Sequence, residues 1–238
     1  MKESAARSSA PIRAVFFDLD DTLCDTIGTR EARARLAFEC LCRMRRDLDV
    51  NALVRRALEP LAEPRSAVGV RGVLAELELM DTEAGAEALE ALRYYYQPLY
   101  LFDGVRETLA ELMMSYELGV ITNWESEEEQ RRKVEHLALD TSFRHFIVSD
   151  SVGHAKPDPR IFERACKLAE VAPREAVFVG DRLDVDVAGA KAAGMRAIWF
   201  NHWGGSLDGA AIEPDAVIER FGELPVVLAE LRFAQAGG

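Results

Sequence analysis

The sequence predicts an α/β fold in which a parallel β-sheet carries an inserted, all-helical domain. Short apolar segments of strand length recur along the chain and alternate with segments of helical periodicity, which is typical of βαβ units. Residues 25–100 interrupt this alternation because they contain no strand-like segment. The composition, 49% hydrophobic and 29% charged over 238 residues, is that of a globular chain long enough for one or two domains.

The first predicted strand covers residues 13–18, where an apolar, partly aromatic run ends in acidic residues. Five later segments have a similar character: residues 118–122, 145–149, 176–180, 196–200 and 216–219. The spacing of apolar residues predicts helices over 105–114, 125–137, 159–169 and 185–193. Gly194 is a suitable stop for the last of these helices. Strands that alternate with helices in this way predict a parallel sheet.

The segment between the first two predicted strands is helical throughout. Helices are predicted over 29–46, 51–58, 70–79 and 83–96, with turns at Pro60, Pro64 and Gly69. The chain is therefore expected to divide as follows: an α/β core over 13–24 and 101–233, a helical domain over 25–100, a disordered N-terminal tail over 1–12 and a frayed C-terminal tail over 234–238.

The chain is acidic, with 41 acidic against 29 basic residues and a formal net charge of -12. Such a chain repels nucleic acid polymers and anionic membranes on average, so neither is expected as a partner. No apolar segment approaches the roughly 18 residues that a membrane span needs. The N-terminus lacks the apolar centre of a signal peptide and the four cysteines show no CxxC or zinc-binding spacing, so a cytoplasmic location with idle thiols is expected. The oligomeric state, monomer or homodimer, stays open.

Polar and ionisable residues follow the predicted strands. They are Asp18, Asp20 and Asp21 after the first strand, Thr122 and Asn123 after the second, Lys156 beyond the third and Asp181 after the fourth. Ligands bind at the carboxyl ends of the strands in open parallel sheets, so these groups are expected to gather at one edge. Each group alone is also compatible with a turn or a helix cap. Their ordered combination is what indicates a site.

The residue types at this edge suit phosphoryl chemistry. Asp18 and Asp20 would share a face on a continuing strand, and a divalent cation relieves the repulsion between two such carboxylates. Mg²⁺ suits a site of few carboxylates, water and substrate oxygens, and Asp181 could complete its ligands. One carboxylate can attack as a nucleophile while the other exchanges protons with the leaving group and water. Lys156 and the Thr122 hydroxyl could neutralise and hold a phosphoryl group.

Four motifs in this order resemble those of the haloacid dehalogenase superfamily, and of its phosphatases in particular. They are Asp18-Leu19-Asp20-Asp21-Thr22 (D-x-D-x-T), Thr122 at the end of an apolar strand, Lys156-Pro157, and Gly180-Asp181 through Asp186 (G-D-x4-D). The resemblance covers residues 13–205 and implies a Rossmann-like core. It also implies that the helical insertion is a C1-type cap, which closes over the site and favours small phosphorylated metabolites.

The resemblance further implies a role for each motif residue. Asp18 would form an aspartyl-phosphate, and Asp20 would be the general acid and base. Mg²⁺ would be held by the carboxylates of Asp18 and Asp181 and by the backbone carbonyl of Asp20. Asp186 would orient Lys156 or a metal-bound water. The residues expected to contact the substrate phosphate are Thr122, Asn123 and Lys156.

The expected function is therefore a Mg²⁺-dependent phosphatase of small phosphate monoesters, similar to phosphoglycolate phosphatases and nucleotidases. A phosphosugar mutase or a haloacid dehalogenase of the same superfamily, and a non-catalytic binding or regulatory module, remain as alternatives. Asp20 disfavours the dehalogenase because a halide leaves without a proton, whereas an alkoxide needs one. The sequence leaves open the physiological substrate, the cap residues that recognise it, and the roles of Trp124, His154 and Arg182.

Overall fold

The structure is a computed structural model that describes residues 10–60, 68–94 and 99–233. It divides into two compact units, one formed by Met1–Cys24 with Leu101–Gly238 and the other by Asp25–Tyr100. Most of the predicted N-terminal tail, the predicted C-terminal tail and the predicted turn at Pro64 lie outside the described residues. Ile12, at the end of the predicted N-terminal tail, is buried, so the packed core begins before the first strand.

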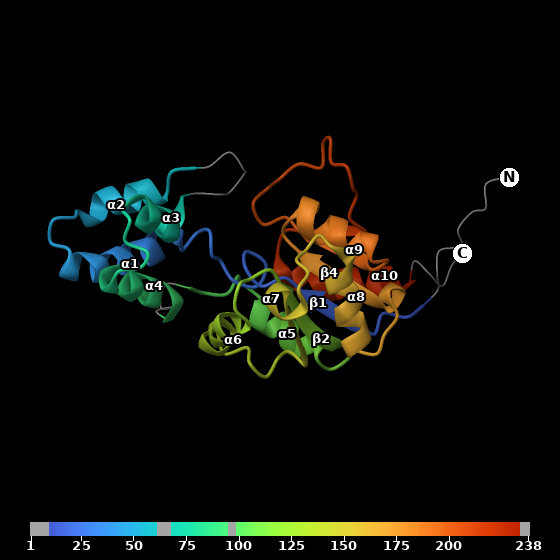
Figure 1. Cartoon of the computed structure of the whole chain (residues 1–238). Helices are drawn as coiled ribbons and strands as arrows, with labels where there is room; N and C mark the ends of the chain where they lie inside the picture. Colours follow the sequence, from blue (N-terminus) through green and yellow to red (C-terminus); the bar gives the residue numbers. More distant parts are fainter. Residues whose placement is uncertain (1–9, 61–67, 95–98, 234–238) are drawn as a thin grey trace. The chain divides into compact units, whose positions relative to one another are not determined.

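The described strands of the first unit form one six-stranded sheet in the order β3-β2-β1-β4-β5-β6, and every neighbouring pair is parallel. Figure 1 labels β1, β2 and β4 of this sheet. The strands are β1 (Ala14–Phe17), β2 (Glu117–Thr122), β3 (His145–Val148), β4 (Ala176–Gly180), β5 (Arg196–Phe200) and β6 (Ala216–Ile218). The predicted parallel α/β sheet is thereby confirmed. The strand order reverses between β1 and β4, which is the switch point where ligands bind in such sheets.

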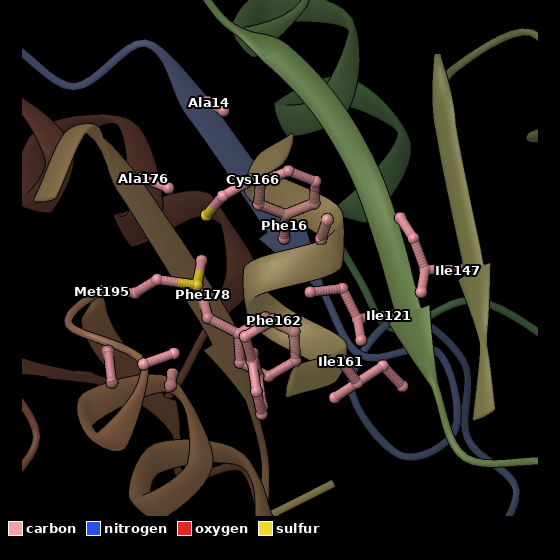
Figure 2. Close-up of a cluster of buried hydrophobic side chains, with 14 of the residues drawn as sticks. Ala14, Phe16, Ile121, Ile147, Ile161, Phe162, Cys166, Ala176, Phe178 and Met195 are labelled. Carbon is pink, nitrogen blue, oxygen red and sulfur yellow. The ribbon is translucent and has the colours of Figure 1, made fainter. Parts of the chain in front are cut away.

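The central strands are apolar along their whole length because both faces of the sheet are covered. On one face, Phe16 and Phe178 belong to a buried cluster with Phe162 of α8 (Pro159–Leu168), as Figure 2 shows. The Phe162 and Phe178 rings meet edge to face with centroids 5.0 Å apart. Phe17 points to the opposite face, where its ring centroid lies 5.9 Å from that of Phe221.

Further helices complete the first unit. They are α5 (Val105–Leu112), α6 (Glu127–His136), α7 (Ser149–Val152), α9 (Ala188–Ala192) and α10 (Leu224–Phe233). The sequence does not predict α7, which is too short to show a periodicity, or α10, whose apolar residues run together. The helix expected over 185–193 is instead a π-helical turn, Leu183–Val187, followed by α9. Such turns often occur at functional sites.

The second unit is helical in its described parts. Its helices are α1 (Arg30–Met44), α2 (Val50–Ala57), α3 (Gly69–Glu76) and α4 (Glu83–Tyr94). They enclose a core of their own, in which Phe38 and Leu41 of α1 pack with Val54 of α2 and Leu74 of α3. In the described parts of the chain, no helix has both the length and the apolar character that crossing a membrane requires.

Candidate active site

Three neighbouring strands bring predicted site residues to one edge of the sheet. The backbone N–H of Asp18 donates to the carbonyl of Val179 on β4 at 2.9 Å, so Asp18 extends the pairing of β1 by one residue. Thr122 is the buried last residue of β2, and Asp181 follows β4 directly. Because β1 lies between β2 and β4, the ends of the three strands are adjacent. The edge expected to hold the site does present these residues together.

Lys156 lies between two of the predicted carboxylates. Its Nζ is 2.5 Å from Asp18 Oδ1 and 2.7 Å from Asp186 Oδ1, and all three side chains are buried. Burial raises the pKa of Asp18 to about 7, Lys156 opposes this shift, and Asp186 adds to it. For Lys156, burial acts to lower the pKa, but the two carboxylates raise it above its ordinary value. The lysine therefore stays charged in a site that is rich in carboxylates.

Asp181 brings a third carboxylate to this cluster. Asp18, Asp181 and Asp186 each offer an oxygen, and the three oxygens lie within 4.8 Å of one another. The Thr22 hydroxyl donates to Asp181 Oδ1 at 3.5 Å. Three buried carboxylates, two of which contact the one ammonium group, carry an excess of negative charge, and all the ligand atoms that they offer are hard oxygens. The described residues therefore fit a divalent cation that prefers oxygen ligands.

Asp186 is placed by the π-helical turn that follows β4. The backbone N–H of Arg182 donates to Asp186 Oδ2 at 3.0 Å, while Oδ1 faces Lys156. One carboxylate oxygen of Asp186 is thus held by a backbone N–H, and the other by the Lys156 ammonium group.

Asn123 is engaged with the Lys156 loop. Its Nδ2 donates to the carbonyl of Lys156 at 2.9 Å, and its Oδ1 accepts from the Lys156 N–H at 2.7 Å. Both ends of the side-chain amide therefore bind the backbone of the residue whose ammonium group meets Asp18. This arrangement fixes the loop, and it ties the end of β2 to the predicted lysine.

Asp20 lies in different surroundings from Asp18. Its carboxylate receives Lys133 Nζ at 2.6 Å (Oδ1) and 2.9 Å (Oδ2), and Gln130 Nε2 at 3.1 Å (Oδ2). Lys133 and Gln130 are both buried on α6. Among the described residues, Asp20 is not one of the three carboxylates grouped by oxygens within 4.8 Å of one another, although its charge still raises the pKa of Asp18. The two predicted catalytic carboxylates thus have separate lysine partners.

Sequence reasoning predicts an amphipathic helix here but misses Gln130 and Lys133, because most residues of α6 are charged and these two do not stand out among them. A signal was nevertheless available. Positions 130, 133, 134 and 137 follow the i, i+3, i+4, i+7 spacing of a buried helix face, which is usually apolar. Polar residues at two of these positions, beside Val134 and Leu137, indicate a buried partner for each.

The three residues whose roles the sequence left open are tied to nearby groups. The indole N–H of Trp124 donates to Glu129 Oε2 at 2.9 Å. His154 Nδ1 lies 3.8 Å from a carboxylate oxygen of Asp158, and the Arg182 guanidinium pairs with the exposed carboxylate of Asp184 at 2.8 Å.

Comparisons with known proteins agree with this geometry. A family model described as haloacid dehalogenase-like hydrolase matches residues 12–194. The glyceraldehyde 3-phosphate phosphatase of Pyrococcus furiosus is 35% identical over 198 residues, which cover 80% of this chain and 81% of the relative. The N-acylneuraminate-9-phosphatase of Rattus norvegicus is 29% identical over 233 residues, covering 91% and 94%. The crystal structure of a 2-haloacid dehalogenase from Pseudomonas syringae pv. Tomato superimposes with a TM-score of 0.62 at 32% identity, covering 92% and 99%. The chain belongs to the haloacid dehalogenase-like hydrolase family.

Proposed function

We propose that this protein is a Mg²⁺-dependent phosphatase that hydrolyses phosphate monoesters of small metabolites. The observation that carries the proposal is the pair of carboxylates after β1, which have separate surroundings: Asp18 contacts Lys156, and Asp20 contacts Lys133. Two carboxylates in different environments are suited to two different roles, nucleophile and proton carrier. The relatives named as phosphatases of glyceraldehyde 3-phosphate and N-acylneuraminate 9-phosphate support a small phosphorylated substrate.

The first step would transfer the phosphoryl group to the protein. A carboxylate oxygen of Asp18 attacks the phosphorus in line with the ester oxygen, an O–P bond forms, and the bond to the leaving oxygen breaks. Asp20 gives its proton to that oxygen, so the product leaves as an alcohol. Thr122 and Lys156 would bind the phosphoryl oxygens, and Asn123 would contribute by holding the Lys156 loop in place.

The second step would hydrolyse the aspartyl-phosphate. Asp20, now ionised, takes a proton from water, the water oxygen bonds to phosphorus, and the bond from phosphorus to Asp18 breaks. Inorganic phosphate leaves, and both carboxylates return to their starting states. The Asp18 and Asp181 carboxylates and the Asp20 carbonyl would hold Mg²⁺, which supplies positive charge to the phosphoryl oxygens. Asp186 would orient Lys156.

Dehalogenation is the alternative with a specific observation behind it, because the dehalogenase of known structure is 32% identical to this chain. A carboxylate can also displace a halide from carbon, and the halide needs no proton. Asp20, bound by Lys133 and Gln130, has no task in that departure. The second carboxylate therefore favours ester hydrolysis over dehalogenation.

The substrate would be selected by the helical unit. The residues proposed for the chemistry all belong to the unit built on the sheet, and the family resemblance implies that a helical insertion such as Asp25–Tyr100 contacts the leaving group. This proposal is the reason to assay several esters rather than one.

The test is an assay of phosphate release from p-nitrophenyl phosphate, glyceraldehyde 3-phosphate, N-acylneuraminate 9-phosphate and phosphoglycolate, with Mg²⁺ and with a chelator. A parallel assay measures halide release from 2-chloropropionate. Phosphate release that needs both Mg²⁺ and Asp18 supports the proposal, with Asp18→Asn checked for folding by circular dichroism. Asp184→Asn is the control for Asp18→Asn. It makes the same chemical change at an exposed carboxylate that lies three residues after Asp181. Halide release without phosphate release would overturn the assignment.

A further inference from the structure

Two buried side chains of α6 hold the carboxylate of Asp20 from one side. Lys133 Nζ contacts both carboxylate oxygens, at 2.6 and 2.9 Å, and Gln130 Nε2 contacts Oδ2 at 3.1 Å. Gln130 and Lys133 are three residues apart on the helix, so their side chains lie on the same face. These contacts join positions that are 110 and 113 residues apart in the sequence.

The burial of these groups is uneven in a way that suits proton transfer. The Lys133 side chain is 4% exposed, whereas that of Asp20 is 23% exposed. The carboxylate is therefore held on its protein side and remains accessible on another. A buried ammonium group is costly unless it is paired, so this lysine is specifically adapted to its partner.

The amide of Gln130 gives a second, independent indication. Its orientation is fixed by the chemistry, because turning the amide over would place Oε1 against the Asp20 carboxylate. Oε1 is buried and has no hydrogen-bond partner among the described residues. A methionine would fill similar space without leaving a buried acceptor unsatisfied. The contact of Nε2 with Asp20 therefore explains the glutamine better than helix packing does.

The ring of Trp124 also lies near the ammonium group of Lys133. Lys133 Nζ lies 5.1 Å from the centroid of the Trp124 ring, within the range of a cation–π contact. The indole N–H donates in turn to Glu129, and the backbone N–H of Trp124 donates to the Ser149 hydroxyl at 2.9 Å. The lysine is thus placed by an aromatic ring as well as by its carboxylate partner.

We propose that Lys133 and Gln130 are positioning residues that hold the side chain of Asp20 in place for proton transfer. The proposal rests on the phosphatase function given above, in which Asp20 protonates the leaving oxygen. The proposal predicts that the effect of losing either residue depends on the leaving group. The loss should lower kcat/KM for esters whose leaving group needs a proton, and leave kcat/KM nearly unchanged for esters whose leaving group departs as an anion.

The test compares kcat/KM for phenyl phosphate and for 2,4-dinitrophenyl phosphate. For each ester, kcat/KM reports only the steps up to release of the phenol. Hydrolysis of the aspartyl-phosphate, which is the same for both esters, therefore does not affect it. Lys133→Met is expected to lower kcat/KM about a hundredfold for phenyl phosphate and less than about threefold for the dinitrophenyl ester. The decrease for phenyl phosphate should lie in kcat, with KM nearly unchanged. Gln130→Met should act in the same direction by about tenfold.

Two controls separate positioning from a general structural effect. Arg132→Met removes an exposed cation of the same helix, which is paired with Glu128. It should leave kcat/KM unchanged for both esters. In an Asp20→Asn background, Lys133→Met should have no further effect on phenyl phosphate, because there is no carboxylic acid left to position. Lys133→Arg keeps the charge and should restore part of the lost activity.

Equal decreases in kcat/KM for the two esters would overturn the positioning role and leave the phosphatase function intact. So would a further decrease when Lys133→Met is added to Asp20→Asn. Failure of the unmodified protein to release either phenol would instead remove the proposed function, and the positioning role with it. If Lys133→Met does not fold, Gln130→Met provides the same comparison of the two esters.

Discussion

A Cβ atom on Gly180 would lie 2.5 Å from the Cβ of Asp186, closer than real atoms of this kind approach. The last residue of β4 has to be glycine because the chain turns back at this point and brings the Asp186 carboxylate to Lys156 Nζ at 2.7 Å. The glycine of the G-D-x4-D pattern thus leaves room for the final acid of the same pattern.

Replacing Gly180 by alanine should therefore displace Asp186 and, through it, Lys156. We expect Gly180→Ala to lower kcat at least about tenfold and to destabilise the fold by about 1–3 kcal/mol through overpacking. Steady-state kinetics and urea unfolding measure the two effects. Gly222→Ala is the matched control, since a Cβ there has nothing within 4 Å. Normal activity in Gly180→Ala would contradict the importance of this contact.

Removing the ammonium group of Lys156 should reduce stability as well as activity, because Asp18 and Asp186 would then be buried together without it. Breaking one partner out of a buried ion pair typically costs about 3–5 kcal/mol. We expect a loss of this size for Lys156→Met in urea unfolding with a chelator present. Adding Asp186→Asn to Lys156→Met should raise the free energy of unfolding by about 1 kcal/mol or more, since one unpaired charge is removed. A double variant less stable than Lys156→Met would argue against this account.

Mg²⁺ should raise the thermal midpoint of the protein, because an ion that binds only the folded chain stabilises it by mass action. At a hundredfold excess over the dissociation constant the effect is about 2.7 kcal/mol. Differential scanning fluorimetry should show this increase, and chelation should reverse it. Asp181→Asn should abolish the Mg²⁺ effect, and Asp184→Asn, on the exposed side of the same loop, should retain it. An unchanged response in Asp181→Asn would place the ion elsewhere.

The parts of the fold and site that are predictable from the sequence share one physical basis. Strands buried on both faces are apolar throughout, so β1 and β4 are recognisable as short runs, and the polar residues that follow them mark the carboxyl edge. Because the carboxyl ends of parallel strands meet at one edge of the sheet, the sequence predicts that Asp18, Thr122 and Asp181 gather there.

Contacts that a helix makes through its buried face are not predictable in the same way. Lys133 and Gln130 reach Asp20 across more than a hundred residues, and nothing in the local sequence of α6 names the partner. The engagement of Asn123 with the Lys156 backbone is of the same kind, because it depends on how two loops meet. Sequence patterns identify elements, whereas these contacts depend on how the elements pack.

The cysteines provide a last prediction, which probes packing rather than catalysis. Burial, with Glu163 nearby, raises the pKa of the Cys166 thiol to about 12, so little reactive thiolate forms. Cys24 and Cys40 are buried, while Cys42 is partly exposed. Burial and the carboxylates of Asp49 and Asp47 also raise the pKa of Cys42, which slows its reaction but leaves it accessible.

In the folded protein at about pH 8, iodoacetamide should therefore modify Cys42 first, at a rate that rises as the pH increases and the thiolate fraction grows. Peptide mass spectrometry identifies the modified residue. Cys42→Ser should remove the early modification, and urea should expose the other three thiols together. Early modification of Cys166 in the folded protein would mean that α8 does not pack on the sheet as the Phe162 and Phe178 contact requires.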